Sequence, residues 1–341
     1  MKIVVHMIKN AKCIATIISD MITTDIGERD TIYPISSAAR ERQGENPAME
    51  AAEQLNEVVD NGDTVLVLTG FLIPPSIVQE TDGPVGAVSV ARALNANAII
   101  ACKPTAVDIR EATATAGELG VLDRDVASGT TRSVSVEAFP ADRNSARTYV
   151  EELLAEVNSS AVVAVDKIAQ TTEGVYNNIA GYEVSEKTAE FDVLYDEIPD
   201  ETLTISVLDA GNEITMGLIQ DLVQDEINYR TEYQCEYNAG IAADMETDLL
   251  VPATVSNCDD HAITACLSHV TGTAALYEPT VEQRMLEQAA MAGNVDKSIG
   301  RTNAWCDGTP PAAHESILHL VREVMIFLST LVVAGSRVNN T

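Results

Sequence analysis

The chain has 341 residues, of which 46% belong to the hydrophobic set and 21% are charged, a composition that excludes disordered and collagen-like chains. Asp and Glu number 52 against 21 Lys and Arg, so the formal net charge at pH 7 is -31. Such a charge repels polyanions, so neither nucleic acid nor an anionic membrane is expected as a partner. Because the acidic excess runs along the whole chain and exceeds what solubility requires, it predicts adaptation to high salt.

The compartment and the redox state follow from the apolar stretches and the cysteines. The apolar opening of the chain is interrupted by two lysines and is followed by no small-residue cleavage site, so a secretory signal is not expected. The late apolar stretch 317–334 contains His319, Arg322 and Glu323, which favours a core helix over a membrane span. The six cysteines form no CxxC pair. We therefore expect a cytoplasmic protein with reduced thiols and no disulfide framework.

Helix and strand patterns alternate along the chain. An amphipathic pattern over 47–60, with Pro47 near its start, predicts a helix, and the β-branched run after it predicts a buried strand. The same alternation recurs at 91–102, 113–122, 133–140, 146–157, 159–167 and 201–211. This order predicts an α/β fold with a mixed or mostly parallel sheet flanked by helices, in a single large domain over residues 1–341.

The first acidic loop follows the predicted strand 65–68. Glu80 and Asp82 lie in this loop, where glycine lets the backbone approach a ligand and two carboxylates can bind a cation or an ammonium group. The competing interpretation is a capping loop in which Asp82 or Thr81 satisfies backbone N–H groups. The groups expected to contact a substrate here are Thr69, Gly70, Thr81 and Gly83.

The second acidic loop has the same design, because Asp209, Gly211, Asn212 and Glu213 come directly after a predicted strand. It is neither a phosphate loop nor a dinucleotide loop, since the Lys-Ser/Thr ending and the GxGxxG spacing are both absent. Carboxylates are hard oxygen ligands, so the two loops together predict a pocket for Mg²⁺, Mn²⁺ or Ca²⁺. We expect their carboxylates to converge at adjacent strand ends, whereas two independent helix caps would leave them more than about 12 Å apart.

Two further motifs carry candidate functional groups. Asp166 and Lys167 end the pattern 159–167, and with only seven lysines in the chain Lys167 is a candidate to hold a substrate carboxylate or act as a base, although pairing with Asp166 is the structural alternative. The segment VSNCDDHAITACLSH suggests zinc, but on a helix its first Cys and last His would lie about 16 Å apart, too far for one ion. Ser256 and Asn257 are expected to cap that helix instead.

Several of these segments occur together in one known family. They are TGF followed by ETDGPVGAVSVARAL, then DKIAQTTEGVYNNIAG, LDAGNEITMG, SN ahead of an alanine-rich helix, and a late DG. On these motifs the chain resembles the D-glutamate cyclase family, including the C-terminal domain of the eukaryotic enzyme, over nearly its whole length. The resemblance implies a single α/β unit that dehydrates D-glutamate to 5-oxo-D-proline.

The chain departs from the usual family pattern at several positions. Where the family has GDGGNEIGMG, Leu208, Ala210 and Thr215 stand in place of glycines, while Asp296 and Asp307 are retained in the late segment. Because the acidic residues survive better than their neighbours, retained cation binding is favoured.

Three functions are compatible with these residues: a D-glutamate cyclase-like lyase, a metal-dependent phosphate-ester hydrolase, and a non-catalytic protein that binds a metal or an amino acid. The expected partner is a small molecule such as an amino acid, and a homo-oligomer is left open. The expected catalytic groups are Glu80, Asp82, Lys167, Asn212 and Glu213. The expected metal ligands are Glu80, Asp82, Asp209 and Glu213, and the expected substrate contacts are Thr69, Gly70, Thr81, Gly83, Gly211 and Asn257.

Overall fold

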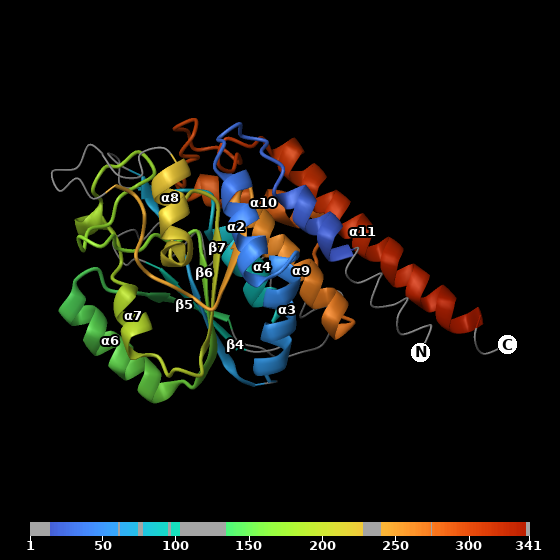
Figure 1. Ribbon diagram of the computed structural model, residues 1–341, viewed down its shortest axis with the longest axis horizontal. Coiled ribbons are helices and arrows are strands. Elements are labelled where there is room, and N and C mark those ends of the chain that lie inside the picture. Colours follow the sequence, from blue (N-terminus) through green and yellow to red (C-terminus); the bar gives the residue numbers. More distant parts are fainter. Residues whose placement is uncertain are drawn as a thin grey trace.

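A six-stranded parallel sheet forms the centre of the molecule (Figure 1). The computed structural model describes residues 14–60, 62–73, 78–94, 97–102, 134–227, 240–273 and 275–338. Within these residues the strand order is β5-β4-β1-β6-β7-β8, and every neighbouring pair in this sheet is parallel. The strands are β1 (Thr64–Leu68), β4 (Asn97–Cys102), β5 (Val134–Ala138), β6 (Ser159–Val165), β7 (Leu203–Leu208) and β8 (Leu249–Pro252).

Helices pack on both faces of this sheet. In Figure 1 the strands β6 and β7 lie between α6, α7 and α8 on the left and α4 and α9 on the right. The first face is covered by a helical stretch at 14–22 and by α3 (Pro47–Val58), α4 (Pro84–Ala93), α9 (Ser256–Thr271), α10 (Pro279–Met291) and α11 (Pro311–Val338). The second face is covered by α2 (Ile32–Gln43), α6 (Arg143–Glu156), α7 (Asp192–Glu197) and α8 (Gln220–Glu226).

The two layers of helices explain the continuous apolar strand sequences. In β1, Val65 and Val67 join the core of the first face, while Leu66 and Leu68 join the core of the second. Successive side chains of a strand point to opposite faces, so a strand covered on both sides is apolar at every position. The predicted α/β fold is therefore confirmed, with a fully parallel main sheet. Antiparallel pairing occurs in the short hairpin of β2 (Leu72–Ile73) and β3 (Val78–Gln79).

The strand order places a change of direction in the middle of the sheet. From β1 the chain moves outward through β4 to β5, and it then returns to the other side of β1 to form β6, β7 and β8. The chain therefore leaves the carboxyl ends of β1 and β6 in opposite directions, the arrangement beside which doubly wound folds bind their ligands. Both predicted acidic loops lie at this edge, one after the β2–β3 hairpin that follows β1 and one after β7.

Most predicted elements that fall on described residues are present. The predicted helix 47–60 is α3, and the late apolar stretch lies within α11, whose side chains Leu318 and Val321 are fully buried. The predicted segment 113–122 lies outside the described residues. No described helix is long and apolar enough to span a membrane. The cysteines of the described part (Cys102, Cys258, Cys266 and Cys306) are buried free thiols, as expected.

Candidate functional site

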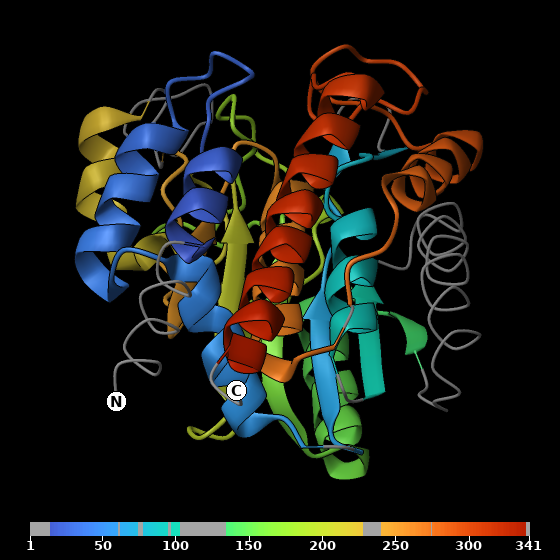
Figure 2. The same ribbon diagram turned by 90° about the vertical axis from the view of Figure 1, so that its right-hand side faces the viewer.

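Buried carboxylates gather at the carboxyl ends of the central strands. They come from the loop after β3, the first residue after β6, the loop after β7 and the loop before α11, and each is at most 5% exposed. Figure 2 shows the loops before α2 (dark blue) and before α11 (red) at the end of the molecule toward which the strands point. We call this set the acidic cluster, and its members are Glu80, Asp82, Asp166, Asp209, Glu213 and Asp307.

Asp82 is held by the N-terminus of a helix far away in sequence. Its Oδ1 accepts the backbone N–H of Asn257 at 3.0 Å and its Oδ2 accepts that of Ser256 at 3.2 Å, the first residues of α9. In exchange, the Oδ1 of Asn257 accepts the N–H groups of Gly83 and Gly86 at the start of α4. The two helices thus cap each other, and their positive ends meet at the acidic cluster.

This reciprocal capping of α4 and α9 corrects one prediction made from the sequence. Ser256 and Asn257 were expected to cap α9, but neither side chain makes a capping hydrogen bond to that helix, which begins at Ser256 itself. Asp82 provides the cap from another loop, so the capping interpretation of Asp82 holds for α9 as well as for its own loop. Asn257 contacts the loop of Gly83 rather than standing free to bind a substrate.

Gly86 is the point of closest approach between α4 and α9. A Cβ built there would lie 1.7 Å from Oδ2 of Asp260 and 2.9 Å from Oδ1 of Asn257. We expect Gly86→Ala to destabilise the fold by about 1–3 kcal/mol, because the added methyl group has no space in this packed contact. Thermal unfolding checks this, with Gly27→Ala as the control, because the φ of Gly27 is not positive and its built Cβ meets no atom closer than 3.4 Å. Equal melting temperatures for Gly86→Ala and the wild type would contradict the close packing.

Glu213 organises its own loop. Its Oε1 accepts the N–H groups of Asp209 and Ala210 at 3.1 and 2.6 Å, and its Oε2 accepts that of Gly211 at 2.6 Å. Burial, with Asp209 and Asp166 nearby, raises the pKa of Glu213 to about 7 despite these donors. Gly211 has a φ of 108°, a conformation suited to glycine, so the loop can turn tightly around the carboxylate.

Carboxylate oxygens from the two acidic loops lie close enough to hold one metal ion. One oxygen each of Asp82, Asp209 and Asp307 lie within 4.8 Å of one another, and the same is true of Asp166, Asp209 and Glu213. Asp209 belongs to both groups, which makes it the centre of the cluster. The predicted convergence of the two loops is therefore present in the structure, well inside the distance that separate caps would give.

Several of these oxygens have no hydrogen bond among the described residues. They are both carboxylate oxygens of Glu80, Oδ2 of Asp166 and Oδ1 of Asp209, and each is buried. Burial raises the pKa of Glu80 and of Asp82 well above the usual range, and the neighbouring Asp166 adds to both shifts. Unsatisfied buried carboxylates are costly, so a bound cation or a shared proton would stabilise the cluster.

Two cationic side chains also face the acidic cluster. Arg29 forms ion pairs with Asp307 and with Asp209, the latter at 3.1 Å, while Lys297 lies 3.5 Å from Oε2 of Glu80 and 3.6 Å from Oδ1 of Asp307. Burial opposes the charge on Lys297, yet Asp307 and Glu80 raise the pKa of this amine well above its usual value. The side chains of Arg29 and Lys297 keep 19% and 16% of their surface exposed. Arg29 and Lys297 therefore form the partly exposed edge of the acidic cluster, which we call the cationic rim.

Two predicted site residues also make contacts that fix the loops around the cluster. Lys167 donates from Nζ to the carbonyl oxygen of Gly70 at 2.8 Å and lies over the ring of Phe191. Asn212 donates from Nδ2 to the carbonyl oxygen of Asn177 at 2.9 Å. Their side chains fix loops around the cluster.

The remaining predicted substrate contacts lie beside the same edge of the sheet. Thr81 donates from Oγ1 to the carbonyl oxygen of Trp305 at 2.6 Å, which ties its loop to the one before α11. Thr69 is fully buried, and its Oγ1 has no hydrogen bond among the described residues. Gly83 has a φ of 88°, and a Cβ there would lie 2.9 Å from Oγ1 of Thr69, so this glycine permits the two loops to touch.

The sequence alone does not place Arg29 and Lys297 beside the acidic loops, although both pair with carboxylates of the cluster. Asp166 and Asp307 were noted but not placed among the ligands. No motif surrounds Arg29, and the only sequence signal for Lys297 is that it directly follows the retained Asp296. Asp296 itself accepts the N–H groups of Ile299 and Gly308 and so shapes the loop rather than facing the cluster with a free oxygen.

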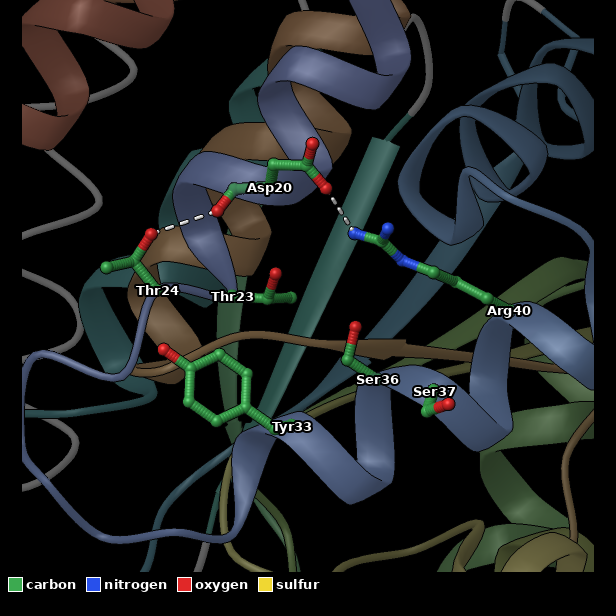
Figure 3. Close-up of a pocket in the computed structure, with 7 residues that line it drawn as sticks. All are labelled: Asp20, Thr23, Thr24, Tyr33, Ser36, Ser37 and Arg40. Atoms are coloured by element: carbon green, nitrogen blue, oxygen red, sulfur yellow. Dashed lines mark hydrogen bonds and ion pairs between the residues drawn. The ribbon is translucent and has the colours of Figure 1, made fainter.

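A separate polar pocket of about 340 Å³ lies between the helical stretch 14–22 and α2 (Figure 3). Its walls carry an ion pair between Arg40 and Asp20 at 2.8 Å, and Arg40 also donates to Oγ of Ser19. None of its lining residues belongs to the acidic cluster. It is an open surface depression in which the charged groups are already paired.

Comparison with known proteins identifies the family. The family model described as "D-glutamate cyclase-like, C-terminal" matches residues 18–322. The chain belongs to the D-glutamate cyclase-like family. No curated protein matches this member of the family. Among solved structures it is similar to "Crystal structure of exonuclease RecJ bound to manganese", with 11% identity over 84% of this chain and 67% of that chain and a TM-score of 0.31, a likeness too distant to bear on function.

Proposed function

We propose that this D-glutamate cyclase-like protein dehydrates D-glutamate to 5-oxo-D-proline at the acidic cluster, with a divalent cation such as Mg²⁺, Mn²⁺ or Ca²⁺. The observation that carries the proposal is the convergence of Asp82, Asp209 and Asp307 within 4.8 Å at the strand edge, in a chain matched by the family model. A cation held by these three carboxylates would draw electron density from the γ-carboxylate of the substrate and assist attack on its carbon.

The cationic rim is suited to an anionic amino acid. Arg29 and Lys297 are the partly exposed members of a region whose carboxylates are buried, so they meet an incoming ligand first. Arg29 and Lys297 each form an ion pair with Asp307. D-Glutamate carries two carboxylates at neutral pH, and each of them can replace Asp307 as the partner of one of these cations. Selectivity for a dicarboxylic amino acid follows from this arrangement.

The overall reaction consumes no base, but protons must move from the substrate nitrogen to the departing oxygen. The substrate ammonium group gives up two protons as its nitrogen forms the new C–N bond, and the departing carboxylate oxygen takes up two protons and leaves as water. Glu80 is suited to carry a proton between them, because burial and Asp166 raise its pKa well above the usual value. Neither oxygen makes a hydrogen bond among the described residues, and the nearest cation, Nζ of Lys297, lies 3.5 Å from Oε2, so Glu80 can exchange a proton beside the cationic rim.

The proposal is tested by incubating the full chain with D-glutamate in concentrated KCl with Mg²⁺, Mn²⁺ or Ca²⁺ and following 5-oxoproline by NMR. We expect metal-dependent ring formation, and the reverse reaction from 5-oxo-D-proline. Absence of both reactions with every metal would contradict the proposed activity. Hydrolysis of p-nitrophenyl phosphate under the same conditions would favour the hydrolase, and binding of D-glutamate to metal-free protein without turnover would favour a binding protein.

A further inference from the structure

A second cluster of potential metal ligands lies among the helices that cover the first face of the sheet. His261 of α9, Glu282 of α10 and His314 of α11 come from three different helices, and each is at most 2% exposed. Nε2 of His261 lies 2.6 Å from Oε2 of Glu282, and Nδ1 of His314 lies 2.9 Å from Oε1. One ligand atom from each residue falls within 4.8 Å of the others.

These contacts are close, but they are not aligned as hydrogen bonds. Both carboxylate oxygens of Glu282 and Nε2 of His261 have no hydrogen-bond partner within the described part of the chain. Burying an ionisable carboxylate without aligned donors is expensive. One ion bound by His261, Glu282 and His314 would satisfy the carboxylate and Nε2 of His261 together.

The other nitrogen of each imidazole already has a polar neighbour. Nδ1 of His261 lies 3.3 Å from Oγ of Ser89, and Nε2 of His314 lies 3.6 Å from Sγ of Cys258. Histidines that bind metals characteristically use one ring nitrogen for the ion and the other for such a contact, which fixes the tautomer and the ring orientation. The two rings are therefore held with His261 Nε2 and His314 Nδ1 directed toward Glu282.

We propose that His261, Glu282 and His314 bind a zinc ion that ties α9, α10 and α11 together. Two imidazoles and one carboxylate form a ligand set well known for zinc, whereas the all-oxygen acidic cluster suits hard cations such as Mg²⁺. The Cys/His motif whose helical spacing argues against a zinc site lies along one helix, and the unbroken α9 keeps Cys258 and His269 too far apart for a common ion. In the proposed site, His261 binds the ion together with Glu282 of α10 and His314 of α11.

The bound metal tests the proposal directly. The full chain is loaded with Zn²⁺, freed of excess metal by gel filtration, and examined by elemental analysis and zinc X-ray absorption. We expect one zinc per chain whose spectrum carries the outer-shell scattering of imidazole ligands, and a melting temperature that falls when the zinc is chelated. Wild-type protein that retains no zinc, or zinc without imidazole ligands, would overturn the site and leave a metal-free His-Glu-His contact.

Variants separate this site from the acidic cluster. Glu282→Gln and His314→Gln are expected to weaken zinc binding at least about tenfold and to remove or alter the imidazole signal. Glu287→Gln is the matched control, because Glu287 is an exposed residue of the same helix, and Asp209→Asn should also keep its zinc. Retention of wild-type zinc affinity in both ligand variants would contradict the proposal. Because the measurement is metal content, its outcome is independent of cyclase activity.

Discussion

Replacing Asp209 by Asn is expected to reduce the kcat/KM for 5-oxoproline formation by about 100-fold or more, the usual cost of removing one preorganised electrostatic group. Asp209 belongs to both carboxylate groups that can hold a cation, and it also pairs with Arg29 at 3.1 Å. The Asn side chain is nearly isosteric but neutral, so it retains the packing and loses the attraction for metal. Activity and metal affinity measured on the same preparation should fall together.

The control for this variant lies at the opposite end of the strands. Asp248, directly before β8, accepts the N–H of Thr204 at 2.8 Å near the amino end of β7, whereas Asp209 follows the carboxyl end of β7. Asp248→Asn removes a carboxylate that contacts β7 while leaving the acidic cluster intact. We expect it to keep wild-type kcat/KM. If Asp209→Asn retained full activity, the acidic cluster would not be the catalytic site.

Lowering the salt concentration is expected to destabilise the protein strongly. The net charge is -31. Repulsion among the carboxylates is screened less in dilute buffer, because the Debye length grows from about 3 Å at 1 M to about 10 Å at 0.1 M. We expect the melting temperature to fall by about 10 °C or more between about 2 M and about 0.1 M KCl. Thermal unfolding followed by circular dichroism across this range measures the effect.

A variant with fewer surface charges provides the control for the salt effect. Glu151, Glu152 and Glu156 are exposed on α6, remote in sequence from the acidic cluster. Changing all three to Gln should reduce the slope of melting temperature against salt, because less repulsion is left to screen. A wild-type melting temperature that stays constant or rises on dilution would show that the acidic surface is not an adaptation to salt.

The fold was largely predictable because its local signals agree with its tertiary environment. Apolar β-branched runs such as 64–68 are buried on both faces, so sequence pattern and burial coincide. The order of the strands was not predictable in the same way. It depends on the return of the chain from β5 to β6, and no residue pattern encodes which neighbour a parallel strand selects.

The acidic part of the site was predictable for a related reason. Asp82 and Asp209 occupy loops that leave the carboxyl edge of one sheet, so topology alone brings them together. Arg29 and Lys297 reach the cluster from loops without a repeating pattern, and their role depends on long-range packing. The sequence also does not predict individual hydrogen-bond partners, such as the carbonyl oxygen of Gly70 that accepts from Nζ of Lys167.

The exchange of caps between α4 and α9 also affects how the protein folds. The hydrogen bonds between Asp82 and Ser256, and between Asn257 and Gly83, each join residues 174 positions apart. Contacts of such separation form only after a large loop has closed, so they belong to the slow, non-local part of folding. The acidic cluster therefore reaches its final geometry late, when α9 docks, and a chain with an unfolded C-terminal third has no complete binding site.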